Sequence, residues 1–272
     1  MTPKFHRAQR MSSWRRLAVH VWGRPADPTV YANIDIDMRQ ALAWIEEAEA
    51  TSGIRITVTH LVVKAIAQAL AAQPDANAII SSGRIWMRNG IDIYCQIATD
   101  QGADLSGAKV EAADTKSVIE IARELAERIE RVRAHKDLGS ERTKASLGRV
   151  PDRLLRPMLR AVEWLTYDRR LDLSRFGIAF DQFGSAMVSN VGGFRVGHAL
   201  APLVPVSRVP IVLLVAGVHD RPLAENGVVI VAPMMTIGCT FDHRLIDGYQ
   251  GSMMAGVVTQ VLTDPYAELG AP

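Results

Sequence analysis

The sequence predicts an α/β protein, more narrowly a two-layer α+β sandwich in which helices flank a large mixed sheet. Three observations favour this class: strand-period and helix-period segments alternate, no internal repeat or low-complexity segment interrupts them, and the last third is rich in strands. With 48% hydrophobic and 22% charged residues, the 272-residue chain has a globular composition and can bury a sizeable core.

The first half of the chain carries the clearest change of period. Residues 30–38, "VYANIDIDM", alternate like a strand, and "RQALAWIEEAEATSG" then takes helical spacing and stops at Gly53. Residues 57–74 are Ala-rich and apolar nearly all round, which predicts a helix in the interior. Residues 83–99 are expected to form two strands joined by a tight hairpin turn at Asn89-Gly90.

A strongly amphipathic helix is expected over residues 115–137, and the character changes after it. Residues 131–175 hold 12 Lys+Arg against 6 Asp+Glu, so this segment carries +6 and the remaining chain −4. Pro157 indicates a kink or a late helix start. The predicted apolar face, flanked by Arg153, Arg156 and Arg160, consists of Leu154, Leu155, Met158, Leu159, Val162 and Leu165. Two roles stay open for it: docking on the rest of the protein, or contact with an anionic membrane or partner.

The last third contains three strand patterns, "GIAFDQFGSAMVSNVGG", "PIVLLVAGV" and "GVVIVAPMMTIGCTFDH", and then a helical one, "YQGSMMAGVVTQVLTDP". A hairpin is expected at Glu225-Asn226-Gly227. Gly192 and Gly193 indicate a tight turn at a strand end.

Two cysteines, Cys95 and Cys239, lie in apolar runs, which predicts buried reduced thiols in a cytoplasmic protein and neither a disulfide framework nor a metal cluster. The apolar run 209–218 is too short to span a bilayer. Nucleic acid is a poor partner, because the basic charge is confined to one segment without a reading motif. Residues 1–11 are expected to be a tail and residues 12–22 a short helix.

The stretch "CTFDHRLIDGYQG" suggests acid–base chemistry, because it places His243 where a strand pattern runs into a helical one. A histidine can accept a proton near neutral pH. Asp247 lies one helical turn on and could anchor Arg244 or a nearby loop. A second pair, His60 and Lys64, lies one turn apart on the predicted helix 57–74, and we interpret it as structural.

A hydroxyl that could donate to a developing oxyanion occurs in "AMVSNVGGFRVG", where Ser189 ends an apolar strand beside glycines. The order of parts is more specific than any one of them. Ser-Asn-x-Gly is followed by a Pro-rich loop, an apolar strand, a hairpin and Asp-His-Arg-x-x-Asp-Gly.

With these motifs the sequence resembles the catalytic domain of the dihydrolipoamide acyltransferases of 2-oxo acid dehydrogenase complexes, relatives of chloramphenicol acetyltransferase. The resemblance covers residues 12 to 264, approximately. It rests on "VTHLVVKAIAQALAAQPDANA", "IDIYCQIATDQG", "ADTKSVIEIARELAE", "MVSNVGG" and above all "DHRLIDG". It implies one acyltransferase domain over residues 12–272.

The resemblance also implies an assembly and a site. The family forms trimers, and higher multiples of trimers, that pass an acyl group between coenzyme A and the thiol of dihydrolipoamide, without a metal, in a channel between subunits. The base corresponds to His243, and the oxyanion donor corresponds to Ser189 of a neighbouring subunit. Asp247 corresponds to the signature aspartate and is expected to hold the geometry of the site. We expect further structural support from Arg244, Gly248 and Asn190.

The chain departs from the family pattern in three respects. We expect no lipoyl domain with its swinging lysine, so another protein would have to supply one in trans. A channel-lining loop of the family corresponds to "TDQGADLSGAKV", residues 99–110, which lacks both of the family's prolines. The short linker before the Ser-Asn strand has grown into a basic helical insert at about 138–177.

Three hypotheses of different classes follow. The leading one is a free-standing acyltransferase that uses coenzyme A and a thiol, hydroxyl or amine acceptor, with His243 as base. The second is a non-catalytic trimeric scaffold, which a buried and closed-off His243 would favour. The third is a peripheral membrane variant whose insert lies on anionic lipid.

Overall fold

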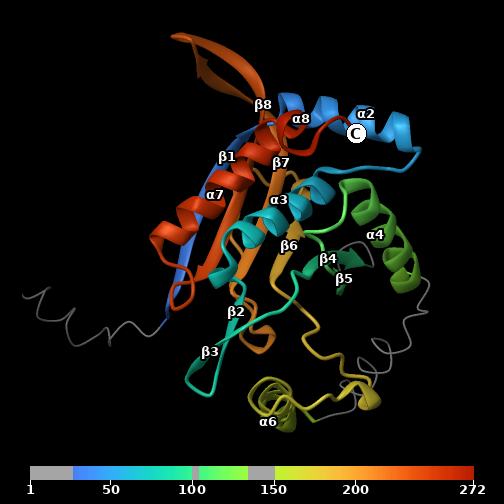
Figure 1. Cartoon of the computed structure of the whole chain (residues 1–272), viewed down its shortest axis with the longest axis vertical. Helices are drawn as coiled ribbons and strands as arrows, with labels where there is room; N and C mark the ends of the chain where they lie inside the picture. Colours follow the sequence, from blue (N-terminus) through green and yellow to red (C-terminus); the bar gives the residue numbers. More distant parts are fainter. Residues whose placement is uncertain (1–26, 100–103, 134–150) are drawn as a thin grey trace, which may run out of the picture.

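The structure is a computed structural model that describes residues 27–99, 104–133 and 151–272. A six-stranded mixed sheet, in the order β1-β8-β7-β6-β4-β5, forms its centre (Figure 1). The strands are β1 Thr29–Asp37, β4 Ile93–Thr99, β5 Asp104–Val110, β6 Ala186–Asn190, β7 Ile211–Glu225 and β8 Val228–Asp242. The predicted class, a large mixed sheet flanked by helices, is confirmed.

Strand β6 is parallel to both of its neighbours, β7 and β4, whereas the other pairs of this sheet are antiparallel. Its first three residues are buried. A parallel strand in the middle of a sheet is covered on both faces, and this explains why "AMV" is continuously apolar. Ser189 and Asn190 then reach the end of the strand, where burial decreases.

Helices cover one face of the sheet (Figure 1). They are α2 Arg39–Ser52, α3 Val58–Ala72, α4 Val118–Arg133, α7 Gly248–Thr263 and the short α8 Pro265–Leu269. Helix α3 packs against both α7 and α4. Nine of its residues are buried, which explains why its sequence is apolar nearly all round. No helix among the described residues is long and apolar enough to cross a membrane.

Several predicted boundaries are confirmed. Helix α2 ends at Gly53, whose φ of 66° is the left-handed conformation that glycine adopts without strain. The hairpin between β7 and β8 turns at Asn226 and Gly227, which have φ of 50° and 79°. These positive angles are those of the hairpin turn that Asn-Gly favours. The tip of this hairpin extends beyond the rest of the sheet (Figure 1).

The hairpin predicted at Asn89-Gly90 is wrong. Strand β3 (Arg84–Met87) pairs with β2 (Ala78–Ser81) in a separate two-stranded sheet, while β4 pairs with β5 and β6. The Asn77 side chain donates to the Gly90 carbonyl at 2.9 Å, so this dipeptide is held as a connection between two sheets. The tight turn lies instead at Ser82-Gly83, where both residues have positive φ.

The predicted insert forms helix α6 (Asp152–Glu163) and a π-helical turn, η3 (Trp164–Asp168). A late start at Pro157 is wrong, because the helix begins at Asp152 and runs through the proline. The expectations for residues 1–11, 12–22 and 138–150 lie outside the described residues. Helix α6 lies at the end of the molecule away from the β7–β8 hairpin tip (Figure 1).

The segment 99–110, expected to be a loop, is mostly strand. Residues 104–110 are β5, which pairs with β4 from Thr99↔Asp104 to Ile93↔Val110. Residues 100–103 between them lie outside the described part. A Cβ at Gly107 would come within 2.3 Å of the Tyr94 ring. The Tyr94 ring therefore lies directly over Gly107, and a side chain at this position would have to displace the ring.

The second face of the sheet, opposite the helices, is partly covered by the chain between β6 and β7. A Cβ at Gly238 would lie 2.0 Å from the Ala199 carbonyl oxygen, so this loop passes directly over the strand. A small apolar cluster fills the same side: Tyr94, Met187, Val209 and Val212 are buried, with Phe183, Ala201, Leu203 and Val204 packed against them. Because side chains alternate along β6, Ser189 shares the face of Met187.

Candidate active site

His243 is the first residue after β8 and is exposed. Its backbone N–H donates to the Pro28 carbonyl at 2.9 Å, which extends the pairing of β8 with β1 by one residue. Within the described part of the chain, no side chain hydrogen-bonds to the imidazole. The strand end therefore fixes the backbone of His243 and leaves its ring accessible, as proton transfer to an external group requires.

Asp242 and Arg244 bracket His243 with a bidentate ion pair. The Arg244 side chain donates to Asp242 through Nε at 2.9 Å and through Nη2 at 2.6 Å, and the Arg244 backbone N–H donates at 3.0 Å. Asp242 is only 7% exposed. These hydrogen bonds raise the pKa of Arg244 above its usual value. Of the two partners expected for Asp247, Arg244 or a nearby loop, the first is wrong, because Asp242 holds Arg244.

Asp247 instead holds the start of α7. Its carboxylate accepts from the Gln250 backbone N–H at 2.9 Å, and the Gln250 side chain accepts from the Asp247 backbone N–H at 3.0 Å. This reciprocal pair is a capping box, which fixes the angle at which the chain enters the helix. A Cβ at Gly248 would meet no atom within 4 Å, so the glycine leaves open space beside the cap.

Ser189 is half-buried near the end of β6, and Asn190 fixes its position. The Asn190 side chain donates to the Thr59 hydroxyl at 2.8 Å and accepts from the Gly192 backbone N–H at 2.8 Å. It thus connects β6 to the first turn of α3 and to the turn that follows β6. The expected supporting role of Asn190 agrees with these bonds, and its contact with Thr59 could not be read from the sequence.

Within one chain, Ser189 and His243 lie far apart. Ser189 pairs with Leu214, Leu214 pairs with Gly238, and His243 lies five residues beyond Gly238 on the far side of β7. Two strand spacings and five residues of strand separate them by about 20 Å. The structure therefore does not bring the two residues together in a single chain.

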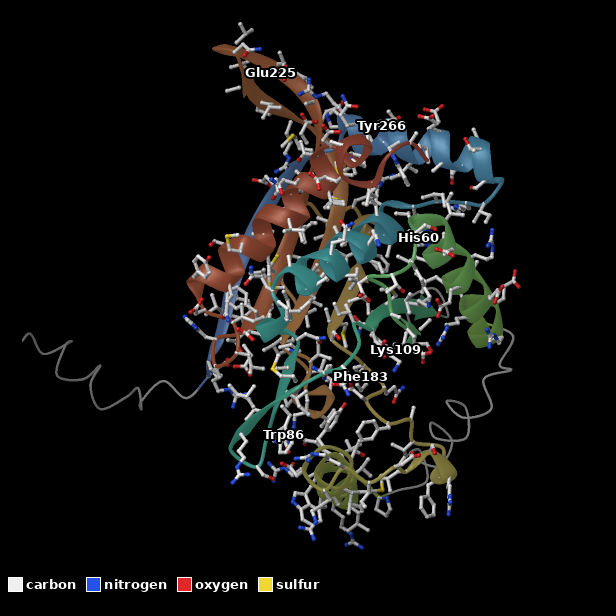
Figure 2. All side chains as sticks on the ribbon, viewed as in Figure 1. His60, Trp86, Lys109, Phe183, Glu225 and Tyr266 are labelled. Carbon is white, nitrogen blue, oxygen red and sulfur yellow. The ribbon has the colours of Figure 1, made fainter. Side chains whose placement is uncertain are left out.

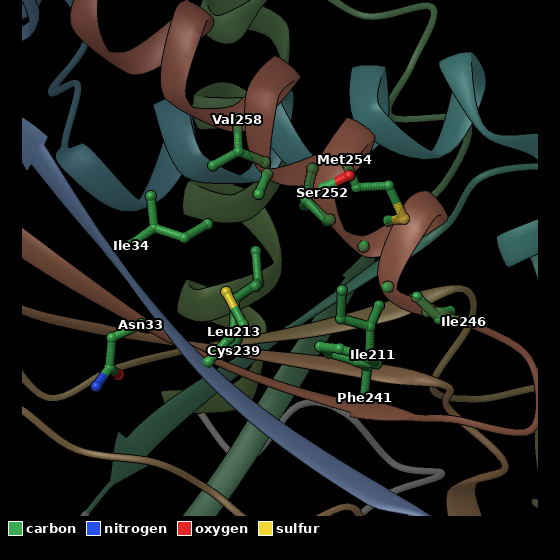
Figure 3. Close-up of a pocket in the computed structure, with 15 residues that line it drawn as sticks. Asn33, Ile34, Ile211, Leu213, Cys239, Phe241, Ile246, Ser252, Met254 and Val258 are labelled. Atoms are coloured by element: carbon green, nitrogen blue, oxygen red, sulfur yellow. The ribbon is translucent and has the colours of Figure 1, made fainter.

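An apolar cavity of about 260 Å³ lies between the sheet and α7 (Figure 3). Phe241 and Ile246, which flank His243 in the sequence, line it together with Cys239. Burial raises the pKa of the Cys239 thiol to about 12, so this sulfur stays protonated near neutral pH. The cavity wall therefore offers mainly hydrocarbon contacts and no thiolate, and the Ser252 hydroxyl on it donates to the Tyr249 carbonyl. Cys95 is likewise buried, as expected of both cysteines.

A second cavity, of about 610 Å³, lies beside the Asp242–Arg244 pair. Pro28 of the segment before β1, Val209 before β7 and Glu163 of α6 contribute to its wall. The wall is mixed, with both charged and apolar side chains. The insert therefore extends to the neighbourhood of the candidate base, which sequence patterns did not indicate.

His60 and Lys64 have structural contacts, in agreement with the interpretation given them. The Thr57 backbone N–H donates to His60 Nδ1 at 3.1 Å, and burial lowers the pKa of His60 to about 4. The Lys64 ammonium donates to the Asp114 carbonyl at 2.7 Å. The described residues contain no group of three or more His, Cys, Asp or Glu side chains that could hold a metal ion.

Comparison with known sequences finds one family. The sequence model of the 2-oxoacid dehydrogenases acyltransferase (catalytic domain) matches residues 9–146 and 181–269. The chain is 23% identical over 265 residues to the dihydrolipoyllysine-residue acetyltransferase component of the pyruvate dehydrogenase complex of Zymomonas mobilis. That match covers 96% of this chain and 50% of the relative. The chain thus spans about half the length of this curated relative.

Comparison with solved structures finds the same fold. The dihydrolipoamide acetyltransferase of Azotobacter vinelandii superposes with a TM-score of 0.66 at 20% identity, over 90% of this chain and 85% of that one. Its structure was determined to investigate a serine, a histidine and an asparagine in the catalytic mechanism. Chloramphenicol acetyltransferase superposes with a TM-score of 0.51 at 13% identity, over 87% and 89% of the two chains.

Proposed function

The chain belongs to the 2-oxoacid dehydrogenases acyltransferase (catalytic domain) family, and on that premise we propose that it transfers an acyl group between coenzyme A and a small acceptor. A dihydrolipoamide-like thiol is the acceptor that the family favours. His243 acts as the general base and Ser189 as the oxyanion donor. Asp242 and Arg244 hold the segment of the base, and Asp247 holds the helix that follows it.

One observation carries this proposal: His243 is exposed while the backbone and side chains on both sides of it are fixed. Its own N–H is bonded to Pro28, the Asp242–Arg244 pair brackets it, and Asp247 caps the next helix. Positioning of this kind is what a catalytic base needs, because a misplaced base loses rate steeply. A scaffold role would have been favoured by a buried His243, and the residue is exposed.

The proposed chemistry is a thioester exchange. His243 takes the proton of the attacking thiol, and the resulting thiolate forms a bond to the carbonyl carbon of the acyl thioester. The Ser189 hydroxyl donates a hydrogen bond to the oxygen that becomes negative. When the tetrahedral intermediate collapses, the bond to the leaving sulfur breaks, and the imidazolium returns the proton to that sulfur.

We propose that a second copy of the chain completes this site. In one chain, Ser189 and His243 are about 20 Å apart. They therefore cannot act on the same thioester, because the base has to contact the attacking thiol while the hydroxyl contacts the carbonyl oxygen. We assign Ser189 to a neighbouring subunit of a homotrimer, or of a larger multiple of trimers. A closed ring of three copies gives every His243 one Ser189 from its neighbour.

The name of a relative suggests the form in which the acceptor thiol reaches this chain. The Zymomonas relative is named for a lipoyl-lysine residue as its acceptor, and this chain covers half of that relative. We propose that a lipoyl domain of another protein delivers the dithiol to this chain in trans. Free dihydrolipoamide serves as the soluble substitute in an assay.

The spacing within the Azotobacter enzyme supports the assignment of Asp247. In that enzyme the asparagine investigated for its part in catalysis lies four residues after the histidine. Asp247 lies four residues after His243 and caps α7. We propose that Asp247 is a positioning residue, because its carboxylate is engaged with the Gln250 backbone.

Thiol release from acyl-coenzyme A compounds tests the proposed function. The assay uses acetyl-, succinyl- and branched-chain acyl-coenzyme A with dihydrolipoamide as the acceptor. We expect turnover by the native protein and a loss of about a hundredfold or more in His243→Ala, because a general base is removed. His219→Ala is the matched control, because His219 is also exposed and lies on the β7–β8 hairpin. Equal rates in the two variants would refute the role of His243.

A further inference from the structure

Residues 151–180, here called the insert surface, fall in the segment that the family sequence model does not match, between residues 146 and 181. We propose that this surface docks on the anionic face of a lipid bilayer. It comprises α6, η3 and the chain that follows as far as Phe180. The proposal rests on how charges and apolar side chains are divided between its inner and outer sides.

The acidic side chains of this region are engaged on its inner side. Arg208 binds Glu163 at 2.5 Å and Asp168 at 3.1 Å. Next to this surface, Arg88 binds Asp181 at 2.8 Å. All five of these side chains are no more than 25% exposed. Because the pairs are formed with residues outside the insert, the acids do not neutralise the arginines of the insert itself.

Most arginines of the insert are exposed on the opposite, outer side. They are Arg153, Arg160, Arg169 and Arg175, whereas the guanidinium of Arg170, which is also exposed, lies over the Trp86 ring. On this outer side one acid with a described side chain is exposed, Asp172, and it accepts from the Ser174 backbone N–H. The outer side is therefore cationic, although the sequence of residues 151–181 holds six arginines against five acids. Charge complementarity selects an anionic partner.

Large apolar side chains are exposed among these arginines. They are Leu154 at 52%, Trp164 at 50%, Leu171 at 48%, Phe176 at 79% and Phe180 at 48%. The Arg169 guanidinium lies over the Trp164 ring, 5.1 Å from its centroid. Arginine beside tryptophan, phenylalanine and leucine is typical of elements that lie in the headgroup region of a bilayer. Nucleic acid or a purely acidic peptide would not use the aliphatic residues.

The insert surface is firmly attached to the rest of the molecule. Tyr167 is 5% exposed and donates to the Ser207 carbonyl at 3.0 Å. The Ser82 backbone N–H donates to Asp168 at 2.7 Å, and the Arg170 guanidinium lies 3.2 Å from the centroid of the Trp86 ring. Trp86 marks the side on which this surface joins the β2–β3 hairpin (Figure 2). A rigid surface presents its apolar side chains together, so little ordering is needed on docking.

Sedimentation of the full-length protein with vesicles tests the proposal. The vesicles are phosphatidylcholine alone, or phosphatidylcholine with 40 mol% phosphatidylglycerol. We expect binding to the anionic vesicles only, weakened by added salt. Arg153→Glu/Arg160→Glu should reduce the partition coefficient roughly 20-fold or more, because each arginine near such a surface contributes about a fivefold factor. Leu154→Ser/Phe176→Ser should also reduce it.

Matched control variants distinguish an effect of the insert surface from an effect of net charge or of exposed apolar side chains elsewhere. Arg123→Glu/Arg131→Glu makes the same charge change at exposed positions of α4. Val229→Ser/Val231→Ser removes two exposed apolar side chains of the β8 hairpin, 71% and 74% exposed. Both control variants should bind the vesicles like the native protein.

Three results would overturn the proposal. The first is no binding to anionic vesicles. The second is an equal loss in the control and insert variants, which would indicate net charge alone. The third is a change of mass in light scattering for the insert variants with vesicle binding unchanged, which would assign the surface to contacts between copies of the chain. Intact far-ultraviolet circular dichroism of each variant shows that it has folded.

Discussion

The segment around His243 and the insert surface are both held by hydrogen bonds to carboxylates, but over different distances along the chain. Arg244 binds Asp242, two residues away, and Asp247 binds Gln250, three residues away. In the insert, Arg208 binds Glu163 across 45 residues, and Ser82 binds Asp168 across 86. Local contacts shape the backbone around one residue, whereas the distant contacts attach one whole segment to another.

This difference predicts which property each contact controls. Breaking a local contact near His243 should reduce activity more than stability, because it misplaces one ring. Breaking a distant contact of the insert should reduce stability and leave the segment around His243 intact.

Among these contacts, the largest effect on activity is expected for Asp242→Asn. The substitution keeps the shape of the side chain but removes the charge that holds Arg244, so the His243 backbone loses one of its restraints. We expect kcat to fall about tenfold or more with little change in KM, because positioning acts on the transition state. Steady-state kinetics with dihydrolipoamide measure this. A rise in KM at unchanged kcat would assign Asp242 to substrate binding instead.

Arg208→Met should destabilise the protein. It leaves Glu163 and Asp168 largely buried without their partner, which costs about 2–3 kcal/mol in the free energy of unfolding. Urea unfolding measures the loss. Arg39→Met is the matched control, because Arg39 is 42% exposed in its pairs with Asp37 and Glu225, so its loss should cost less than about 1 kcal/mol. Equal destabilisation by both variants would contradict the idea that the less exposed pairs of Arg208 contribute more to stability than the pairs of Arg39.

His60 combines both kinds of contact. Its hydrogen bond is with Thr57, three residues away, whereas packing against the rest of the protein buries its ring. Burial first, and the nearby Arg55 second, lower the pKa of His60 to about 4 from a usual value of 6.5. Between these values the unfolded chain binds a proton that the folded chain does not. The contribution of His60 to stability is therefore complete above pH 6.5 and decreases as the pH falls toward 4, by roughly 3 kcal/mol in total.

The measurement is the free energy of unfolding in urea at pH 7 and at pH 4.5. His60→Gln is the informative variant, because glutamine at this position of the first helical turn can still accept the Thr57 N–H but does not titrate. We expect a smaller difference between the two pH values in the variant. An unchanged difference would assign the pH dependence to other groups.

The smallest effect is expected for Asp247→Ala. Loss of a helix cap costs about 1 kcal/mol in the free energy of unfolding. Because the cap also sets the angle at which the chain leaves His243, we expect a fall in kcat as well. Asp264→Ala at the cap of α8 is the control, since its carboxylate accepts from Ala267 in the same way but far along the chain from His243. Normal activity in both variants would limit Asp247 to stability.

The range of the contacts also explains what could be predicted from the sequence. The ends of α2, α3 and the β7–β8 hairpin depend on residues within a turn of them, such as Gly53 and Asn226, and these predictions are confirmed. The hairpin at Asn89-Gly90 is wrong, because the side chain of Asn77 and the partners of β4 decide the pairing there.

For the candidate site, the sequence indicated His243, Ser189, Asp247, Arg244, Asn190 and Gly248, through motif order and resemblance. It did not indicate that Asp242 holds Arg244 or that Thr59 holds Asn190. The sequence could have indicated the first contact, because Asp242 lies two residues before Arg244 in "FDHR". The second joins residues 131 positions apart, and no local pattern reports such a contact.

The central claim is that His243 of one chain and Ser189 of another form one site, and mixed oligomers test it most directly. His243→Ala and Ser189→Ala, each inactive alone and each with its own affinity tag, are produced together and purified through both tags. A ring of three that contains both variants has one interface with both residues intact, so we predict about one third of the native activity. No activity above that of the separate variants would contradict the account.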